Sequence, residues 1–111
     1  MEHITYEDFE KVDIRAGTII AVDDFFKARK AAYQITIDFG NLGIKKSSAQ
    51  ITEIYAKEDL LDRQVIAIVN FAPKQIANFM SECLILGIYN MDNQVVLMKP
   101  EFTVPNGGRL L

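Results

Sequence analysis

Residues 33–48 read YQITIDFGNLGIKKSS, and this stretch decides the fold. Apolar and polar side chains alternate over residues 33–39, which is typical of a strand with one buried face. GNLG then brings two glycines to a turn, and IKKSS resumes an extended pattern. The stretch therefore predicts a β-hairpin whose second strand begins at Ile44.

The rest of the chain contains further short strands. VDIRAGTIIAVDDF, from residue 12, is rich in β-branched residues, and Gly17 within it predicts a bulge or a sharp bend. Apolar runs separated by turn residues follow as VIAIVNF (65–71), ECLILGIY (82–89) and VVLM (95–98). The βαβ alternation of a parallel sheet is absent, so we expect a small closed antiparallel barrel, whose closure removes free strand edges.

Two short helices are expected. Thr5 can cap a helix near residues 5–12, because its hydroxyl can accept from a free backbone N–H of the first turn. Ser47 and Gln50 have the spacing of a capping box, and apolar residues follow them at helical spacing. The local pattern therefore predicts a second helix beginning at Ser47.

The length and composition limit the possible functions. The chain has 111 residues, which fits a single domain over residues 1–111. No apolar run reaches the roughly 18 residues that a membrane-spanning helix needs. The acidic start, MEHITYEDFEKVD, is unlike a secretory signal. We expect a cytoplasmic protein without membrane insertion.

The sequence offers little for catalysis. His3 is the single histidine, so no histidine-based triad or histidine-rich metal site can form. Cys83 lies in an apolar run without a basic neighbour, which predicts a buried, unreactive thiol. We expect no enzyme activity, no cofactor and no metal. Two carboxylates brought together by the fold are the weaker alternative.

Basic residues cluster although the net charge is -3. Lys27, Arg29 and Lys30 form one group, and Lys45 with Lys46 forms another. The acids gather elsewhere, near the start of the chain and between residues 53 and 62. Binding of a polyanion follows the distribution of charge as well as its sum, so a local basic patch is compatible with this composition.

Four segments occur in a familiar order: DIRAG (13–17), KSSAQIT (46–52), NFAPKQI (70–76) with SE (81–82), and PNG (105–107). Together they resemble the tRNA-binding domain of the OB-fold class, and within it the CsaA-type, export-related chaperones. The resemblance covers nearly the whole chain. It implies an all-β protein, a five-stranded OB-fold barrel with short helices, an N-terminal helix and a C-terminal extension.

The resemblance implies tRNA as a ligand of this non-enzymatic protein. Lysines can neutralise phosphates, and hydroxyl and amide groups can both donate and accept hydrogen bonds. The residues that the resemblance points to are Lys45, Lys46, Ser47, Ser48, Gln50, Asn70, Lys74 and Ser81. Gln75 occupies a position where relatives often have a second basic residue, and the missing positive charge lowers the expected electrostatic affinity for RNA. On the local pattern alone, Ser47 and Gln50 only cap a helix.

The family also implies binding of unfolded or precursor polypeptides for export. Phe71, Phe79 and Met80 suit this role, because aromatic and methionine side chains make adaptable apolar contacts. We expect Ile76 in the core and Phe79 or Met80 to be more exposed. The alternative is a peptide-binding or structural module whose RNA surface has decayed.

The apolar ends of the chain predict a homodimer, because the resemblance implies pairing through the terminal segments. The apolar residues concerned are Ile4, Tyr6, Phe9, Phe102, Val104, Leu110 and Leu111.

Three charged groups are expected to be structural. Asp13 and Arg15 share a strand face and can pair, and Glu82 precedes a buried strand, which predicts a buried, hydrogen-bonded carboxylate.

Overall fold

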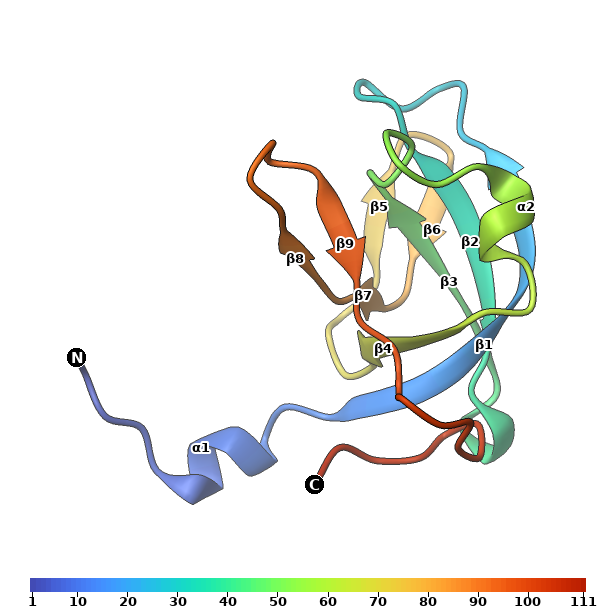
Figure 1. The fold of residues 1–111 in the computed structure, drawn as a ribbon. Helices are drawn as coiled ribbons and strands as arrows, with labels where there is room; N and C mark the ends of the chain where they lie inside the picture. The colour runs from blue at the N-terminus through green and yellow to red at the C-terminus, as the bar shows by residue number, and fades with distance from the viewer.

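The computed structural model describes every residue of the chain, and a five-stranded antiparallel sheet forms its centre (Figure 1). The strands lie in the order β3-β2-β1-β4-β7 across the sheet. Their bounds are β1 Ile14–Asp24, β2 Tyr33–Asp38, β3 Ile44–Ala49, β4 Gln64–Ile68 and β7 Leu84–Ile85. The sheet curls into a nearly closed barrel, so the predicted all-β, five-stranded OB-fold class is confirmed.

Two small hairpins and three short helical elements complete the chain. Their bounds are β5 Lys74–Ile76 with β6 Phe79–Ser81, β8 Gly87–Tyr89 with β9 Val95–Leu97, α1 Tyr6–Glu10, the 3₁₀ helix η1 Gly40–Leu42, and α2 Lys57–Leu60. Each helix is too short, and none is apolar enough, to cross a membrane.

The β2–β3 hairpin confirms the prediction made from residues 33–48. The two strands are antiparallel, and Ile35 of β2 lies opposite Ser47 of β3. Ile35 and Ile37 are fully buried, while Gln34, Thr36 and Asp38, which alternate with them, lie on the outer face. Gly43 ends the connection with φ +88°, a conformation that other residues rarely adopt, so this turn depends on a glycine.

Side chains close the barrel where β3 meets residues 81–82. The Glu82 N–H donates to the Lys46 carbonyl oxygen at 2.7 Å, and the Lys46 N–H donates to a Glu82 carboxylate oxygen at 3.0 Å. The Ser48 N–H donates to the Ser81 hydroxyl at 3.1 Å. We call these three hydrogen bonds the seam. They satisfy backbone groups on the free edge of β3. Glu82 is hydrogen-bonded as predicted, but it is half-buried and not fully buried.

The core fills the barrel with apolar side chains from strands and connections alike. Leu60 is fully buried in it, so α2 is held to the barrel by a side chain whose burial contributes about 1.5–3 kcal/mol. Cys83 belongs to the same cluster, and burial raises the pKa of its thiol to about 12. The thiol is therefore protonated at neutral pH, which agrees with the predicted buried, unreactive cysteine.

The predicted helix beginning at Ser47 is wrong. Ser47 lies within β3, and residues 52–54 form a turn. Pairing with β2 and burial of the Ser47 side chain in the barrel override the local capping pattern. The second helix, α2, begins only at Lys57.

The predicted irregularity in the first strand is displaced. The pairing register between β1 and β2 shifts between Ile19 and Ala21, not at Gly17. Gly17 serves another purpose, because a Cβ atom there would lie 2.6 Å from Ile37 Cγ2 and 2.7 Å from Phe39 Cδ1. The absence of a side chain at residue 17 lets the large Phe39 ring pack against β1.

Residues 70–82 form more regular structure than a loop. Lys74–Ile76 and Phe79–Ser81 pair as the β5–β6 hairpin. The expected strand over residues 82–89 is divided, because β7 ends the main sheet and β8 pairs with β9 in a separate ribbon. In Figure 1 the β5–β6 hairpin lies beside β3, while the β8–β9 ribbon stands farther out at the left of the barrel.

The two ends of the chain converge near the start of β1. Residues 107–110 hydrogen-bond along β1, from the Gly107 N–H to the Ala16 carbonyl and from the Leu110 N–H to the Ile14 carbonyl. The predicted pair is present, with Arg15 Nε 2.6 Å from an Asp13 carboxylate oxygen.

The predicted N-terminal helix is present as α1, which Thr5 caps through the Asp8 N–H at 3.1 Å. None of the residues of α1 is buried, and the helix projects from the barrel (Figure 1). The apolar side chains near this end therefore face outward, with Ile4 72% and Tyr6 68% exposed.

Candidate nucleic-acid interface

Five basic side chains without a carboxylate partner lie around the outer face of β3, and a sixth, Lys45, lies on the inner face of the same strand. Elsewhere, four basic side chains pair with a carboxylate within 4.0 Å, as Lys57 does with Asp24 and Arg15 with Asp13, whereas Arg63 and Lys99 do not. No carboxylate lies within that distance of Lys27, Arg29, Lys30, Lys45, Lys46 or Lys74. Their positive charge is therefore not neutralised by an ion pair within the chain.

Strand geometry divides the KKSSAQ segment between two faces. Successive side chains of a strand point to opposite sides, so Lys46, Ser48 and Gln50 share the outer face. Lys45 is half-buried on the inner face, and Ser47 on the same face is only 1% exposed. Ser47 was predicted to contact nucleic acid, but its side chain lies inside the barrel and no surface ligand can reach it.

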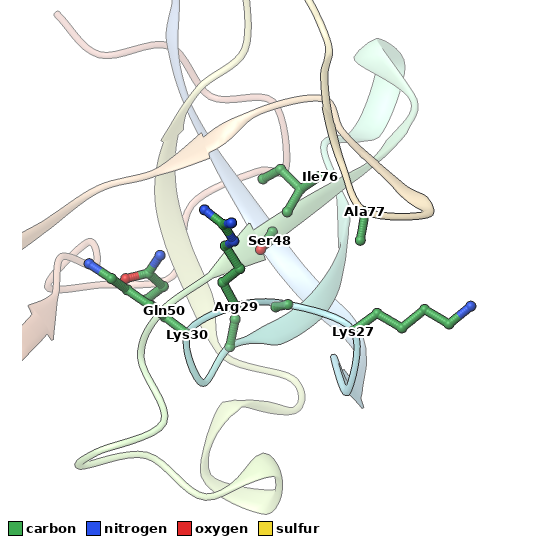
Figure 2. A pocket seen from close by; sticks show the side chains of 9 residues that line it. Lys27, Arg29, Lys30, Ser48, Gln50, Ile76 and Ala77 are labelled. Carbon is green, nitrogen blue, oxygen red and sulfur yellow. The ribbon is translucent and has the colours of Figure 1, made fainter.

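Two hollows meet at Ser48. One is about 500 Å³ and lies between residues 27–32 and the β5–β6 hairpin (Figure 2). The other is about 400 Å³ and lies below the hairpin, where Lys74, Ser81 and Glu82 line it. Ser48 and Ile76 border both hollows. We call this surface, from residue 27 across Ser48 to Lys74, the Ser48 face.

A small aromatic cluster fixes the walls of the Ser48 face. Phe25 follows β1, Phe79 begins β6, and their ring centroids are 5.3 Å apart. Both rings are buried together with Ala32, and the side chain of Ile76 packs against them. The connection between β1 and β2 is thereby held against the β5–β6 hairpin, and the larger hollow lies between these two segments.

Two predicted contact residues already have partners in the fold. Asn70 accepts from the Asp13 N–H at 3.0 Å and donates to the Lys11 carbonyl at 2.7 Å, so it anchors the segment after α1. Ser81 accepts from Ser48 in the seam. Lys74 and Gln50, in contrast, are exposed, and their side chains make no hydrogen bond or ion pair within the chain.

The three predicted peptide-binding residues differ in exposure. Phe71 is 56% exposed and Met80 is 47% exposed, so both present apolar surface. Phe79 is 8% exposed, because its ring packs on Phe25. The expectation that one of Phe79 and Met80 would be exposed is met by Met80. Phe79 does not offer a surface contact, and Ile76 is half-buried beside it.

Lys27, Arg29 and Lys30 were missed as site residues. They follow β1 in a connection that closes over the larger hollow, and Figure 2 shows Arg29 reaching toward Ser48 while Lys27 points away. Their basic cluster was the only signal in the sequence. Nothing in the local sequence indicates that the connection folds back onto β3, because the Phe25–Phe79 contact joins residues far apart in the chain.

Comparison with known proteins places this arrangement in a family. Residues 14–109 match the family model of a tRNA binding domain. The chain belongs to the tRNA binding domain family. The predicted family resemblance is therefore confirmed, and the match includes both walls of the Ser48 face.

Two solved structures of CsaA chaperones are similar over almost the whole chain. The protein from Bacillus anthracis str. Ames is 44% identical with a TM-score of 0.93, and the alignment covers 99% of this chain and 100% of that one. The protein from Picrophilus torridus is 50% identical with a TM-score of 0.92, over 98% and 100% of the two chains. The predicted CsaA-type resemblance is confirmed.

Curated relatives include methionine--tRNA ligases. The enzyme of Thermococcus onnurineus is 34% identical over 110 residues, which are 99% of this chain and 15% of the enzyme. The chain therefore spans about one seventh of the length of the curated relatives that it matches.

Proposed function

We propose that this chain is a non-enzymatic tRNA-binding protein that holds its ligand on the Ser48 face. The observation that carries the proposal is the gathering of five basic side chains without acidic partners around the outer face of β3, in a member of the tRNA binding domain family. Such a protein would work in the cytoplasm, where tRNA is found.

The charge distribution supports RNA binding although the net charge is -3. Asp8, Asp13 and Asp24 are engaged by basic residues away from the Ser48 face, so part of the negative charge is locally compensated. A phosphate backbone releases counterions when ammonium and guanidinium groups neutralise it, and this term supplies most non-specific affinity. A barrel strand with hydrogen-bonding side chains and flanking basic loops is the usual OB-fold surface for nucleic acid.

Charge changes at the β5–β6 hairpin test this function. Lys74→Ala should weaken tRNA binding and lower the slope of log affinity against log salt by about one unit, because one phosphate contact is lost. Gln75→Arg should strengthen binding and steepen the slope by a similar amount, because a second positively charged side chain is added next to Lys74 in the sequence. Fluorescence anisotropy with labelled tRNA across a salt series gives both quantities.

Lys99→Ala is the matched control, because Lys99 is exposed, unpaired and outside the Ser48 face. It should leave the slope unchanged. If the parent protein does not bind tRNA, or if Lys74→Ala and Lys99→Ala behave alike, the proposed surface is wrong.

A second function, binding of unfolded or precursor polypeptides for export, is favoured by one observation. Phe71 and Met80 are exposed, and Phe71 lines the smaller hollow with Ala72 and Leu84. Met80 lies outside that hollow, and an exposed aromatic side chain and an exposed methionine both suit adaptable apolar contacts. We infer that this end of the barrel binds extended apolar segments next to the RNA surface.

Replacing Phe71 and Met80 together by serine should reduce affinity for an unfolded polypeptide at least severalfold, because about half of each apolar side chain is available for contact. The salt slope of tRNA binding should stay unchanged, since no charge is altered. Met91→Ser is the control, because Met91 is fully exposed at the β8–β9 turn. Equal loss in the control, or unchanged polypeptide affinity in the double variant, would exclude this role for the hairpin.

The exposed ends of the chain support a homodimer. Ile4, Tyr6 and Phe102 are 72%, 68% and 78% exposed, and Leu110 and Leu111 lie beside α1. A cluster of apolar side chains in water is unfavourable, and a second copy would cover it by a two-fold contact. We infer that two chains pair through α1 and the C-terminal segment.

Sedimentation equilibrium at micromolar concentration should give twice the chain mass of 12.6 kDa. Tyr6→Asp with Phe102→Asp should shift the mass to that of one chain, because two exposed apolar side chains would bring charge into the contact. Phe26→Asp, at a side chain that is 90% exposed elsewhere on the barrel, should leave the dimer intact. A parent protein that sediments as a monomer would contradict the assembly.

A further inference from the structure

The larger hollow of the Ser48 face is more than a charged surface. Its volume of about 500 Å³ falls within the roughly 300–1,000 Å³ typical of small-molecule sites. A surface that only attracts phosphates needs exposed lysine or arginine side chains, and it does not need to be concave. This hollow has a floor, two walls and a basic rim, and the two walls are held together by the Phe25–Phe79 cluster.

The floor carries two hydrogen-bonding side chains that the fold does not use. The Ser48 hydroxyl and the Gln50 amide lie on the outer face of β3 and have no side-chain hydrogen-bond partner within the chain. Each can donate and accept, which matches the mixed donor and acceptor edge of a nucleobase. Gln34, the neighbour opposite Ser48 on β2, does not line the hollow.

The walls are apolar and the rim is basic. Ala28 and Ala32 line one wall, and Ile76 and Ala77 line the other. Arg29 extends across the hollow from the first wall, as Figure 2 shows. The lining contains no carboxylate that would repel a phosphate. Bases outside a helix bind proteins by packing on flat or apolar groups, including guanidinium planes, while their edges form hydrogen bonds.

We propose that this hollow binds one unpaired nucleotide of the bound RNA. The base lies between Ile76 and the Arg29 guanidinium, its edge faces Ser48 and Gln50, and the adjoining phosphate is neutralised by Lys30. The inference rests on the RNA-binding function proposed above and adds a preference for single-stranded over paired nucleotides.

Paired nucleotides cannot form the hydrogen bonds that the Ser48 hydroxyl and the Gln50 amide offer in the hollow. In a duplex the Watson–Crick edges of the bases are occupied and the bases are stacked, so a paired base cannot enter a hollow between two protein segments. A duplex can still contact Lys46 and Lys74 through its phosphates, because both side chains are exposed. The hollow therefore affects selectivity for unpaired nucleotides more than general affinity for RNA.

The test compares two RNAs that share one hairpin stem, one with a blunt end and one with a short single-stranded overhang. The parent protein should bind the overhang RNA about tenfold more tightly, the effect of roughly one or two base-edge hydrogen bonds. Gln50→Leu should remove most of this preference and leave the salt slope unchanged, because it deletes an amide and no charge. Gln75→Leu is the control, since Gln75 is exposed outside the hollow, and it should keep the preference.

Arg29→Ala provides a second variant with a different signature. It should lower the salt slope by about one unit for the overhang RNA and by less for the blunt RNA. Equal binding of both RNAs by the parent, or a full preference in Gln50→Leu, would overturn the nucleotide subsite. Either result leaves the tRNA-binding function standing if Lys74→Ala still lowers the slope with tRNA, so the two failures are distinguishable.

Discussion

Strand β3 lies at the edge of the five-stranded sheet, so the N–H and C=O groups along its outer side need partners from elsewhere in the chain. A barrel of so few strands leaves unpaired backbone groups unless this edge is closed, and β7 is too short to pair along it. Residues 81 and 82 solve the problem with side chains: the Glu82 carboxylate and the Ser81 hydroxyl accept from successive outward N–H groups of Lys46 and Ser48. Hydrogen bonds to a charged acceptor are stronger than neutral ones, so Glu82 contributes most to this closure.

Closure also decides which side chains are left for a ligand. Because Glu82 and Ser81 bind the backbone of β3, the side chains of Lys46, Ser48 and Gln50 project outward without internal partners. The same segment brings β6 beside β3, and the Phe25–Phe79 contact then holds the β1–β2 connection over the strand. A fold-closing feature and a binding surface are thus built from one stretch of chain, which explains why polar residues cluster there.

Strand identity was largely predictable, since alternation over residues 33–39 and the glycine turn after it are local signals. The inward direction of the Ser47 side chain was not predictable. The sequence around Ser47 is compatible with a helix cap and with a strand, and only its pairing with β2 decides between them. Phe79 was misplaced for a similar reason: its burial depends on Phe25, which is distant in sequence. The exposed lysines were predicted correctly as surface groups, whereas the part played by Arg29 required the fold.

The most direct measurement is the mapping of backbone amide chemical shifts during titration of the isotope-labelled protein with tRNA. We expect the largest changes in residues 27–30, 46–50 and 74–81, on both walls and the floor of the Ser48 face. The amides of Lys46 and Ser48 should also be protected from solvent exchange before any RNA is added, because they belong to the seam. Changes confined to residues 1–12 and 102–111 would contradict the account.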